Sequence, residues 1–248
     1  MQEVLDTVDR RTREFEAHGL FEALRDDKVR PEAKLAVVPP LAHFVMSFAD
    51  IYAHVLREEP TEDAIQQLVN AHTREDGGHW KWFVADLEKL GFDPDIGFAD
   101  TLRFLWSDAL LETRRLSYGI CRLGLDAAPL TRLAMVLSIE ATGAVTLAHL
   151  TPIGQAFADR TGQRLVYFGA HHLETEQDHT LEEASTRATL EAIELSAAQR
   201  TQLDEVVNRV FDLFTAGADD LLAFVRVPER LAPWFHGRAN AGVSSGRR

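Results

Sequence analysis

Apolar residues recur at helical spacing through most of the chain, and the interruptions coincide with residues that favour turns. Alternating β-branched runs, which would indicate strands, are hard to find. The pattern therefore predicts an all-α protein of about seven to eight helices. Thr61 is expected to cap the third helix, and Pro39 and Pro40 to kink the second. The expected helices cover about 2–26, 31–57, 62–91, 99–123, 129–150, 164–189 and 196–225, with a short one before Gly162.

Composition supports a single helical domain. Of the 248 residues, 46% are hydrophobic, and the 15 glycines and 9 prolines are few for a chain of this length. We expect one domain over residues 1–236. The remaining segment, 237–248, reads GRANAGVSSGRR and has no aromatic or large apolar side chain that could offset its ordering entropy. This segment is predicted to be a disordered tail.

The formal net charge of -13 makes the molecule repel phosphate backbones and anionic lipid headgroups. We expect neither nucleic acid nor membrane as a partner. The N-terminal residues are charged throughout, and the sequence suggests no uninterrupted apolar run of spanning length, so a cytoplasmic location is expected. Cys121 is the only cysteine, so any bound metal must be held by nitrogen and oxygen.

The strongest chemical signal is HHLETEQDH, residues 171–179. On a helix, His172, Glu176 and His179 lie within an arc of roughly 60°, so two imidazoles and a carboxylate converge. A solvated polar helix surface carrying histidines is the competing interpretation. The segment is thus a candidate for half of a metal site.

A second polar segment, HTREDGGHW, occupies residues 72–80. His72, Glu75 and His79 share one face at helical spacing. Gly77 and Gly78 inside the expected helix cost about 1 kcal/mol each relative to alanine. Close approach of a ligand or of a neighbouring helix would account for these glycines.

Glu140 is isolated in the apolar sequence LAMVLSIEATGAVTLAHL. A buried carboxylate must be neutral, paired with a cation or bound to a metal. Together the three segments offer a pool of candidate ligands with three carboxylates and three histidines. Such a pool suits two iron or manganese ions better than one zinc. His43, Asp50 and His54 share a face of the second helix and could orient ligands, contact substrate or simply be satisfied polar groups. The predicted ligands are Glu75, His79, Glu140, His172, Glu176 and His179.

These residues resemble the haem-oxygenase-like diiron oxidases and oxygenases, in the superfamily of the TenA-type thiaminases and the oxidase of PQQ synthesis. The resemblance covers roughly residues 10–225 and includes the opening segment HGLFEALRDDKVRPEAKLAVVPPLAHFVMSF. The family pattern is a carboxylate and a histidine on one helix, a lone glutamate on a later one, and then His-x3-Asp/Glu-x2-His. Glu176 stands where aspartate is common. Some members have their first carboxylate at the position of His72, so either Glu75 or His72 is the ligand, and we favour Glu75 with His72 in support.

The resemblance implies a haem-oxygenase-like helical bundle that binds two Fe2+ ions and activates O2. It implies oxidation of a small amino-acid-like or fatty-acid-like substrate, by desaturation, N-oxygenation or cleavage of a carbon–carbon bond. A ferritin-like iron-binding protein and a metal-free hydrolase or small-molecule binding module of the TenA type are the alternatives. A homodimer is also possible.

Overall fold

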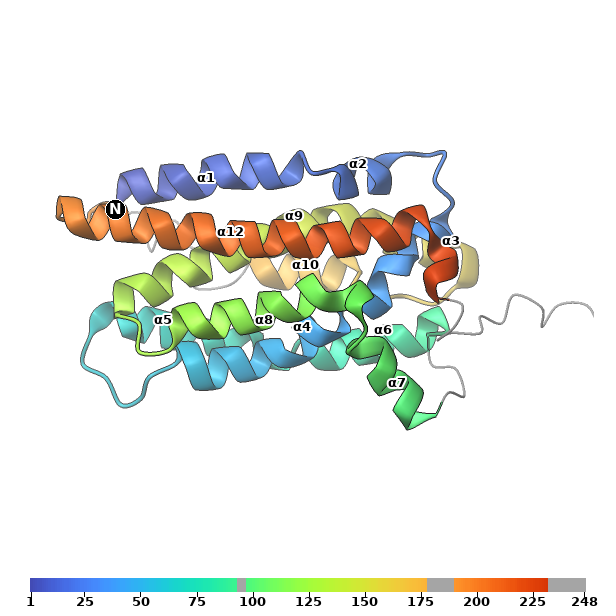
Figure 1. Ribbon diagram of the computed structural model, residues 1–248, viewed down its shortest axis with the longest axis horizontal. Helices are drawn as coiled ribbons and strands as arrows, with labels where there is room; N and C mark the ends of the chain where they lie inside the picture. The colour runs from blue at the N-terminus through green and yellow to red at the C-terminus, as the bar shows by residue number, and fades with distance from the viewer. Residues whose placement is uncertain (93–96, 178–189, 232–248) are drawn as a thin grey trace, which may run out of the picture.

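The computed structural model describes residues 1–92, 97–177 and 190–231, and within these ranges every regular element is helical. The long helices lie alongside one another in a bundle (Figure 1). The all-α bundle predicted from periodicity is therefore confirmed. The α-helices are α1 (Gln2–Glu16), α2 (Gly19–Arg25), α3 (Pro31–Lys34), α4 (Val38–Ile51), α5 (Ala64–Glu75), α6 (Trp80–Leu90), α7 (Phe98–Leu105), α8 (Leu111–Gly124), α9 (Pro129–Thr161), α10 (Ala170–Gln177) and α12 (Ala197–Arg226).

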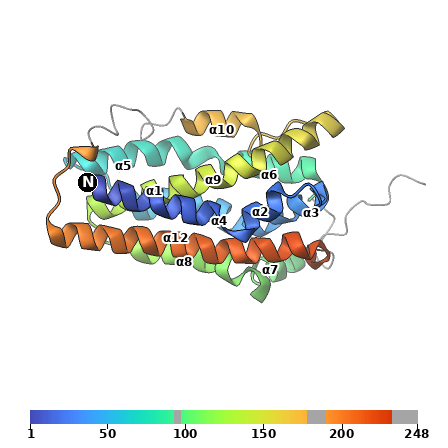
Figure 2. The same cartoon turned by 90° about the horizontal axis from the view of Figure 1, so that it is seen from above.

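Helix α9 is the central element of the bundle. It packs against α1, α5, α8, α10 and α12, as Figure 2 shows from above. Leu133, Val136 and Ile139 are buried in its first half, and each buried aliphatic side chain contributes about 1.5–3 kcal/mol. Glu140 follows directly, with its side chain 18% exposed. A largely buried carboxylate therefore lies within a core helix.

Several helix ends are where local chemistry predicts them. Pro129 occupies the first turn of α9, where its missing N–H costs no hydrogen bond. Gly91 and Gly162 follow α6 and α9 with φ of 79° and 75°, the left-handed conformation that glycine adopts readily. Ser196 and Gln199 form a capping box at the start of α12.

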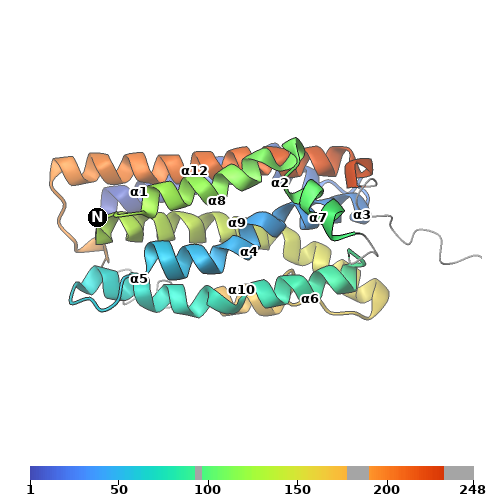
Figure 3. The same cartoon turned by 60° about the horizontal axis from the view of Figure 1, so that its bottom comes forward.

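Other boundaries differ from the predictions. The first helix is interrupted at His18, whose side chain accepts a hydrogen bond from the backbone N–H of Leu20 and caps α2. Asp63, rather than Thr61, caps α5 by accepting from two backbone N–H groups. The fourth expected helix is divided into α7 and α8 by a turn (Figure 3). A side-chain cap or a turn sets each of these boundaries.

Two further predictions, the end of the fifth helix and the kink at Pro39 and Pro40, were also wrong. The fifth helix does not stop near Leu150 but runs through Pro152 to Thr161. Ile153 beside the proline is 7% exposed, so burial against neighbouring helices holds the segment together despite the lost backbone hydrogen bond. Pro39 and Pro40 lie in the first turn of α4, after a 3-10 turn, and not in the middle of a continuous helix.

Two helical stretches, Leu35–Leu56 and Pro129–Thr161, are long and apolar enough to cross a membrane by length and composition alone. No stretch of spanning length was expected from the sequence. About half of each is buried inside the bundle, 50% and 56% of the respective windows. Core helices of soluble proteins satisfy the same criterion, so these stretches carry little weight as evidence for a membrane location.

Candidate metal centre

The end of α5 positions two side chains of the candidate centre. His72 and Asp76 are four residues apart, which makes them neighbours on one helix face. The α-helix then tightens into a 3-10 turn over Asp76–Gly78. In such a turn residues three apart eclipse each other, so His79 lies on the same side as Asp76. Asp76 is thereby placed between two histidines.

Among the described residues, no neighbouring helix approaches the two glycines of this turn, which removes one of the two explanations expected from the sequence. A Cβ atom added at Gly77 or Gly78 would meet nothing within 4 Å in the described structure. Close approach of another helix therefore does not account for them. They lie instead in the short 3-10 segment, where the change of helical geometry sets the direction of His79.

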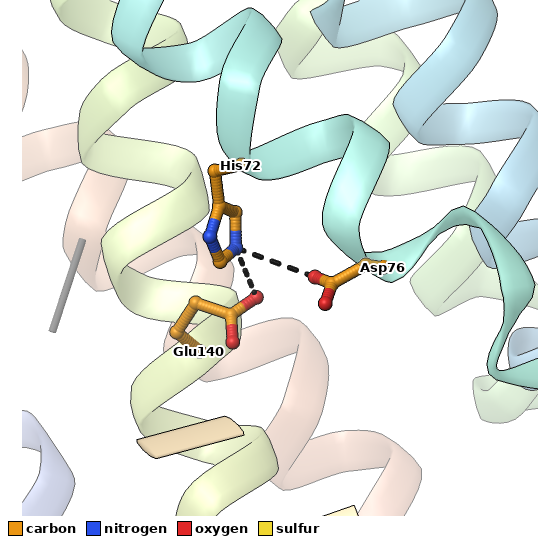
Figure 4. Close-up of side chains that lie close together, drawn as sticks. All are labelled: His72, Asp76 and Glu140. Carbon is orange, nitrogen blue, oxygen red and sulfur yellow. Dashed lines mark ion pairs between the residues drawn. The ribbon is translucent and has the colours of Figure 1, made fainter. Parts of the chain in front are cut away.

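His72, Asp76 and Glu140 form the tightest group, and their candidate ligand atoms all lie within 4.8 Å of one another. Nε2 of His72 is 3.0 Å from Oε1 of Glu140 and 3.3 Å from Oδ2 of Asp76 (Figure 4). The side chains of His72 and Asp76 are 1% and 2% exposed. One imidazole from α5 is therefore held between carboxylates from two different elements.

The end of α4 supplies a further contact. Residues Tyr52–Leu56 form a π-helical turn, in which the N–H of Arg57 donates to the carbonyl of Tyr52. Such turns occur frequently at functional sites. The hydroxyl of Tyr52, a fully buried residue, donates to Oε1 of Glu140 at 2.7 Å. This hydrogen bond fixes the carboxylate on the side that faces His72.

His79 and His172 form a second group beside the first. Nδ1 of His172 lies 2.9 Å from the carbonyl oxygen of Tyr167, which can only accept, so this nitrogen carries a proton. Nε2 of His172 then presents its lone pair and lies 3.2 Å from Nδ1 of His79. The ring of Trp82 stacks on His79 at a centroid distance of 4.5 Å. The two imidazoles are thus held together at the junction of α6 and α10.

Asp76 connects the two groups through its two oxygens. Oδ2 faces His72, and Oδ1 lies 3.7 Å from Nδ1 of His79. Burial alone would lower the pKa of His72, but the charges and hydrogen bonds of Glu140 and Asp76 outweigh it and raise that pKa to about 11. An imidazolium at His72 therefore balances the buried carboxylates in the protein without metal.

The structure brings together three of the six predicted ligands, namely Glu140, His79 and His172. Glu75 lies nearby, with Oε2 3.7 Å from Nδ1 of His72, but its side chain is 33% exposed. Glu176 belongs to α10, and its side chain is outside the described part of the structure. His179 lies outside the described residues altogether.

The second set of polar residues lies elsewhere. Asp50 and His54 are exposed, and His54 lies within the π-helical turn Tyr52–Leu56, which changes the helical register on which their shared face was predicted. Nδ1 of His43 is 3.2 Å from Oγ of Ser117 on α8, and burial lowers the pKa of His43. Among the described contacts, none joins these three residues to the candidate centre, so the suggestion that they orient ligands is not supported.

Asp76 was missed in the sequence. Its signal was present, because it lies four residues after His72 and three before His79, which are both helical contact spacings. The glutamate beside it was chosen because Glu75 also shares a face with His72 and His79. The two acids differ in burial, because Asp76 is buried and Glu75 is partly exposed. Which of them is buried depends on how α5 is rotated against α9.

A cavity of about 460 Å3 adjoins the centre, a volume typical of ligand pockets. Apolar side chains from α1, α4, α9 and α12 form most of its wall. Asp76, His79, Glu140 and His172 contribute to its lining. The candidate ligands therefore face a space that could accommodate a small organic molecule.

No protein-family profile matches the chain, and no curated protein matches it at a significant level.

Proposed function

We propose that this protein is a non-haem diiron oxidase or oxygenase of the haem-oxygenase-like superfamily, which uses O2 to oxidise a small organic substrate. The observation that carries the proposal is the position of Asp76. Its two oxygens face different imidazoles, at 3.3 Å from Nε2 of His72 and 3.7 Å from Nδ1 of His79. A carboxylate between two nitrogen donors could supply one oxygen to each ion of a two-metal site.

The donor set fits iron. Carboxylate oxygens and imidazole nitrogens suit iron and manganese, whereas closed structural zinc sites commonly include thiolates. His72 and Glu140 would hold one ion, and His79 and His172 the other, with Asp76 between them. Metal binding would then displace the proton that His72 carries in the protein without metal, because an imidazole must be neutral to coordinate.

The surrounding residues would prepare the site for this chemistry, in which bound iron supplies the electrons that reduce O2. The hydroxyl of Tyr52 orients Glu140, and the carbonyl of Tyr167 fixes which nitrogen of His172 is available. Apolar side chains such as Phe44 line the adjoining cavity and would disfavour water beside the metal site.

The proposal is tested by anaerobic addition of Fe2+ to chelator-treated protein, followed by O2. We expect about two irons per chain, consumption of O2 and a transient visible absorption band. Asp76→Asn should lose at least one iron. Glu174→Gln is the matched control, because Glu174 is an exposed acid on α10, two residues from His172.

Binding of a single zinc without O2 consumption would contradict the proposal, as would normal iron loading of Asp76→Asn. Glu75→Gln addresses the ligand chosen from the sequence. Iron loss in that variant, with full loading of His72→Gln, would return Glu75 to the ligand set and remove His72 from it.

A further inference from the structure

We propose that Asp86 on α6 is a positioning residue for the candidate metal centre and that it acts through a single peptide group. This group, the relay peptide, joins Tyr167 to Phe168 in the loop between α9 and α10. Through it the carboxylate of Asp86 fixes which ring nitrogen of His172 carries the proton and strengthens the other nitrogen as a metal donor. The role of His172 as a ligand rests on the function proposed above, whereas the hydrogen-bonded chain from Asp86 to His172 is present in the protein without metal.

The placement of Asp86 is the first step. Asp86 is fully buried, and its two oxygens face the backbone of the loop. The N–H of Val166 lies 2.9 Å from Oδ1 and 3.0 Å from Oδ2, and the N–H of Phe168 donates to Oδ2 at 3.1 Å. The ammonium group of Lys89, 3.3 Å from Oδ1, places a positive charge beside the buried carboxylate. The negative charge of Asp86 is therefore held against the loop that leads into α10.

The relay peptide itself is the second step. Its N–H belongs to Phe168 and its carbonyl to Tyr167, so one planar unit carries both groups. In a trans peptide the two groups point in opposite directions. The N–H donates to Asp86, and the carbonyl oxygen accepts from Nδ1–H of His172 at 2.9 Å. A carboxylate, one peptide group and one imidazole thus form a continuous chain of hydrogen bonds.

The charge of Asp86 gives this chain a role beyond holding the loop. Hydrogen bonds in series polarise one another, and an ionised acceptor makes the strongest of them. A carboxylate at the N–H end of the relay peptide increases the electron density on the carbonyl oxygen of Tyr167, which then binds the His172 proton more firmly. A carboxylate or carbonyl bonded to the N–H of a metal-binding histidine sets its tautomer and raises its basicity. In this protein a carbonyl makes that contact, and a carboxylate strengthens it from behind.

Other contacts hold the loop in place, so the charge of Asp86 can be removed without removing the loop from its position. Phe168 is 1% exposed, and its ring lies 6.0 Å from that of Phe83 on α6. The ring of Tyr167 lies 5.4 Å from the same phenylalanine. Lys89 donates to the carbonyl of Arg164 at 2.8 Å. A neutral side chain of the same size at position 86 should therefore leave the course of the loop intact.

Nitrogen and amide-proton NMR of chelator-treated, full-length protein measures both links of the chain, at a fixed pH about two units above the ordinary pKa of histidine. In the unaltered protein, Nδ1 of His172 should be protonated and Nε2 unprotonated, and the amide proton of Phe168 should resonate at low field. Asp86→Asn keeps an acceptor oxygen but removes the charge. In this variant the Phe168 amide proton and the Nδ1 proton of His172 should both move to higher field, and the Nε2–H tautomer should become detectable.

Lys89→Met is the matched control. Lys89 contacts the same carboxylate and the same loop, through Oδ1 of Asp86 and the carbonyl of Arg164, but not the relay peptide. This variant should lower the thermal stability and leave the tautomer of His172 unchanged. If Asp86 served only to hold the loop, Asp86→Asn and Lys89→Met would change the spectrum of His172 alike.

His149 provides an internal reference in the same spectra. Its Nδ1 also lies near a backbone carbonyl, 2.8 Å from that of Val145, and this contact is confined to α9. The ring signals of His149 should therefore stay constant in both variants. A shift there as large as that of His172 would show a general disturbance of the fold and would count against a specific relay.

Anaerobic titration with Fe2+ adds a metal readout. Asp86→Asn should lower the affinity for one iron by about 10–100-fold, as is usual when a group behind a ligand is changed, and Lys89→Met should not. Unchanged His172 signals in folded Asp86→Asn would overturn the inference. An unprotonated Nδ1 of His172 in the unaltered protein would also overturn it, and this measurement decides the matter even if Asp86→Asn does not fold.

The outcomes for the relay and for the proposed function are separable. The NMR measurements are made without metal, so failure of the unaltered protein to load iron would contradict the proposed function and leave the effect of Asp86 on His172 standing. Normal iron loading with no response of His172 to Asp86→Asn would refute the relay alone.

Discussion

Replacing Tyr52 by phenylalanine removes a single hydroxyl from the candidate centre. That hydroxyl donates to Oε1 of Glu140 at 2.7 Å, and the same oxygen lies 3.0 Å from Nε2 of His72. Tyr52 has no solvent exposure, and its ring lies against Phe48 at a centroid distance of 4.1 Å. Phenylalanine preserves this packing, so the substitution isolates the hydrogen bond.

The expected magnitude follows from the charge of the acceptor. A hydrogen bond to a charged group contributes about 1.5–3 kcal/mol, more than one between neutral groups. In the buried site, water does not readily replace the lost donor. Tyr52→Phe should therefore lower the free energy of unfolding of the metal-free protein by about 1.5–3 kcal/mol. If Glu140 is a ligand, metal affinity should fall by about 10–100-fold, as is usual when a group that orients a ligand is removed.

Urea unfolding in the presence of a chelator measures the first quantity, and anaerobic titration with Fe2+ measures the second. Tyr118→Phe is the control, because Tyr118 is 57% exposed and loses the same hydroxyl. The reasoning is refuted if the two variants unfold at the same urea concentration. A stability loss without any change in metal affinity would show that the hydrogen bond supports the fold alone.

Three further predictions concern the fold and its charges. Gly154→Ala should destabilise by about 3 kcal/mol in thermal or urea unfolding, because its Cβ would lie 2.0 Å from the carbonyl oxygen of Phe168; normal stability would show that α9 can shift there. Asp220→Ala should cost about 1–2 kcal/mol, because Oδ2 accepts from two backbone N–H groups at the start of α8; hydrogen exchange should quicken in that turn first. His72, with a pKa of about 11 against its ordinary 6.5, should stabilise the metal-free fold fully below pH 6.5 and lose this contribution as pH rises through 11. Imidazole nitrogen NMR shifts report its titration, and a midpoint near the ordinary value would contradict the prediction.

The fold was predictable where local chemistry acts alone. Gly91 and Ser196 mark helix ends by backbone conformation and capping, and both were identified from the sequence. The predicted end near Leu150 was wrong because α9 continues through Pro152, and the burial that holds this helix together comes from helices distant in the sequence. The first helix was predicted to run without a break over 2–26. A single side-chain cap at His18 interrupts it, although the apolar pattern continues.

The candidate site was predictable to the extent that one residue contrasts with its neighbours. Glu140 is conspicuous because every nearby position is apolar or small, and the structure pairs it with Tyr52 and His72. Tyr52 had no such contrast. Its role depends on a π-helical turn, and a one-residue change of helical register cannot be read from periodicity.

The consecutive acids Glu75 and Asp76 show where sequence reasoning reaches its limit. Adjacent residues on a helix point about 100° apart, so only one of the two can face the interior fully. Both have acceptable spacing to His72 and His79, and the rotation of α5 against α9 decides between them. The structure turns Asp76 inward at 2% exposure and leaves Glu75 33% exposed. A buried carboxylate requires compensation that an exposed one obtains from water, and His72 provides it for Asp76 in the metal-free protein. Burial therefore favours His72 and Asp76 over Glu75 as the donors from this segment, and the metal loading of Asp76→Asn and Glu75→Gln decides between the two acids.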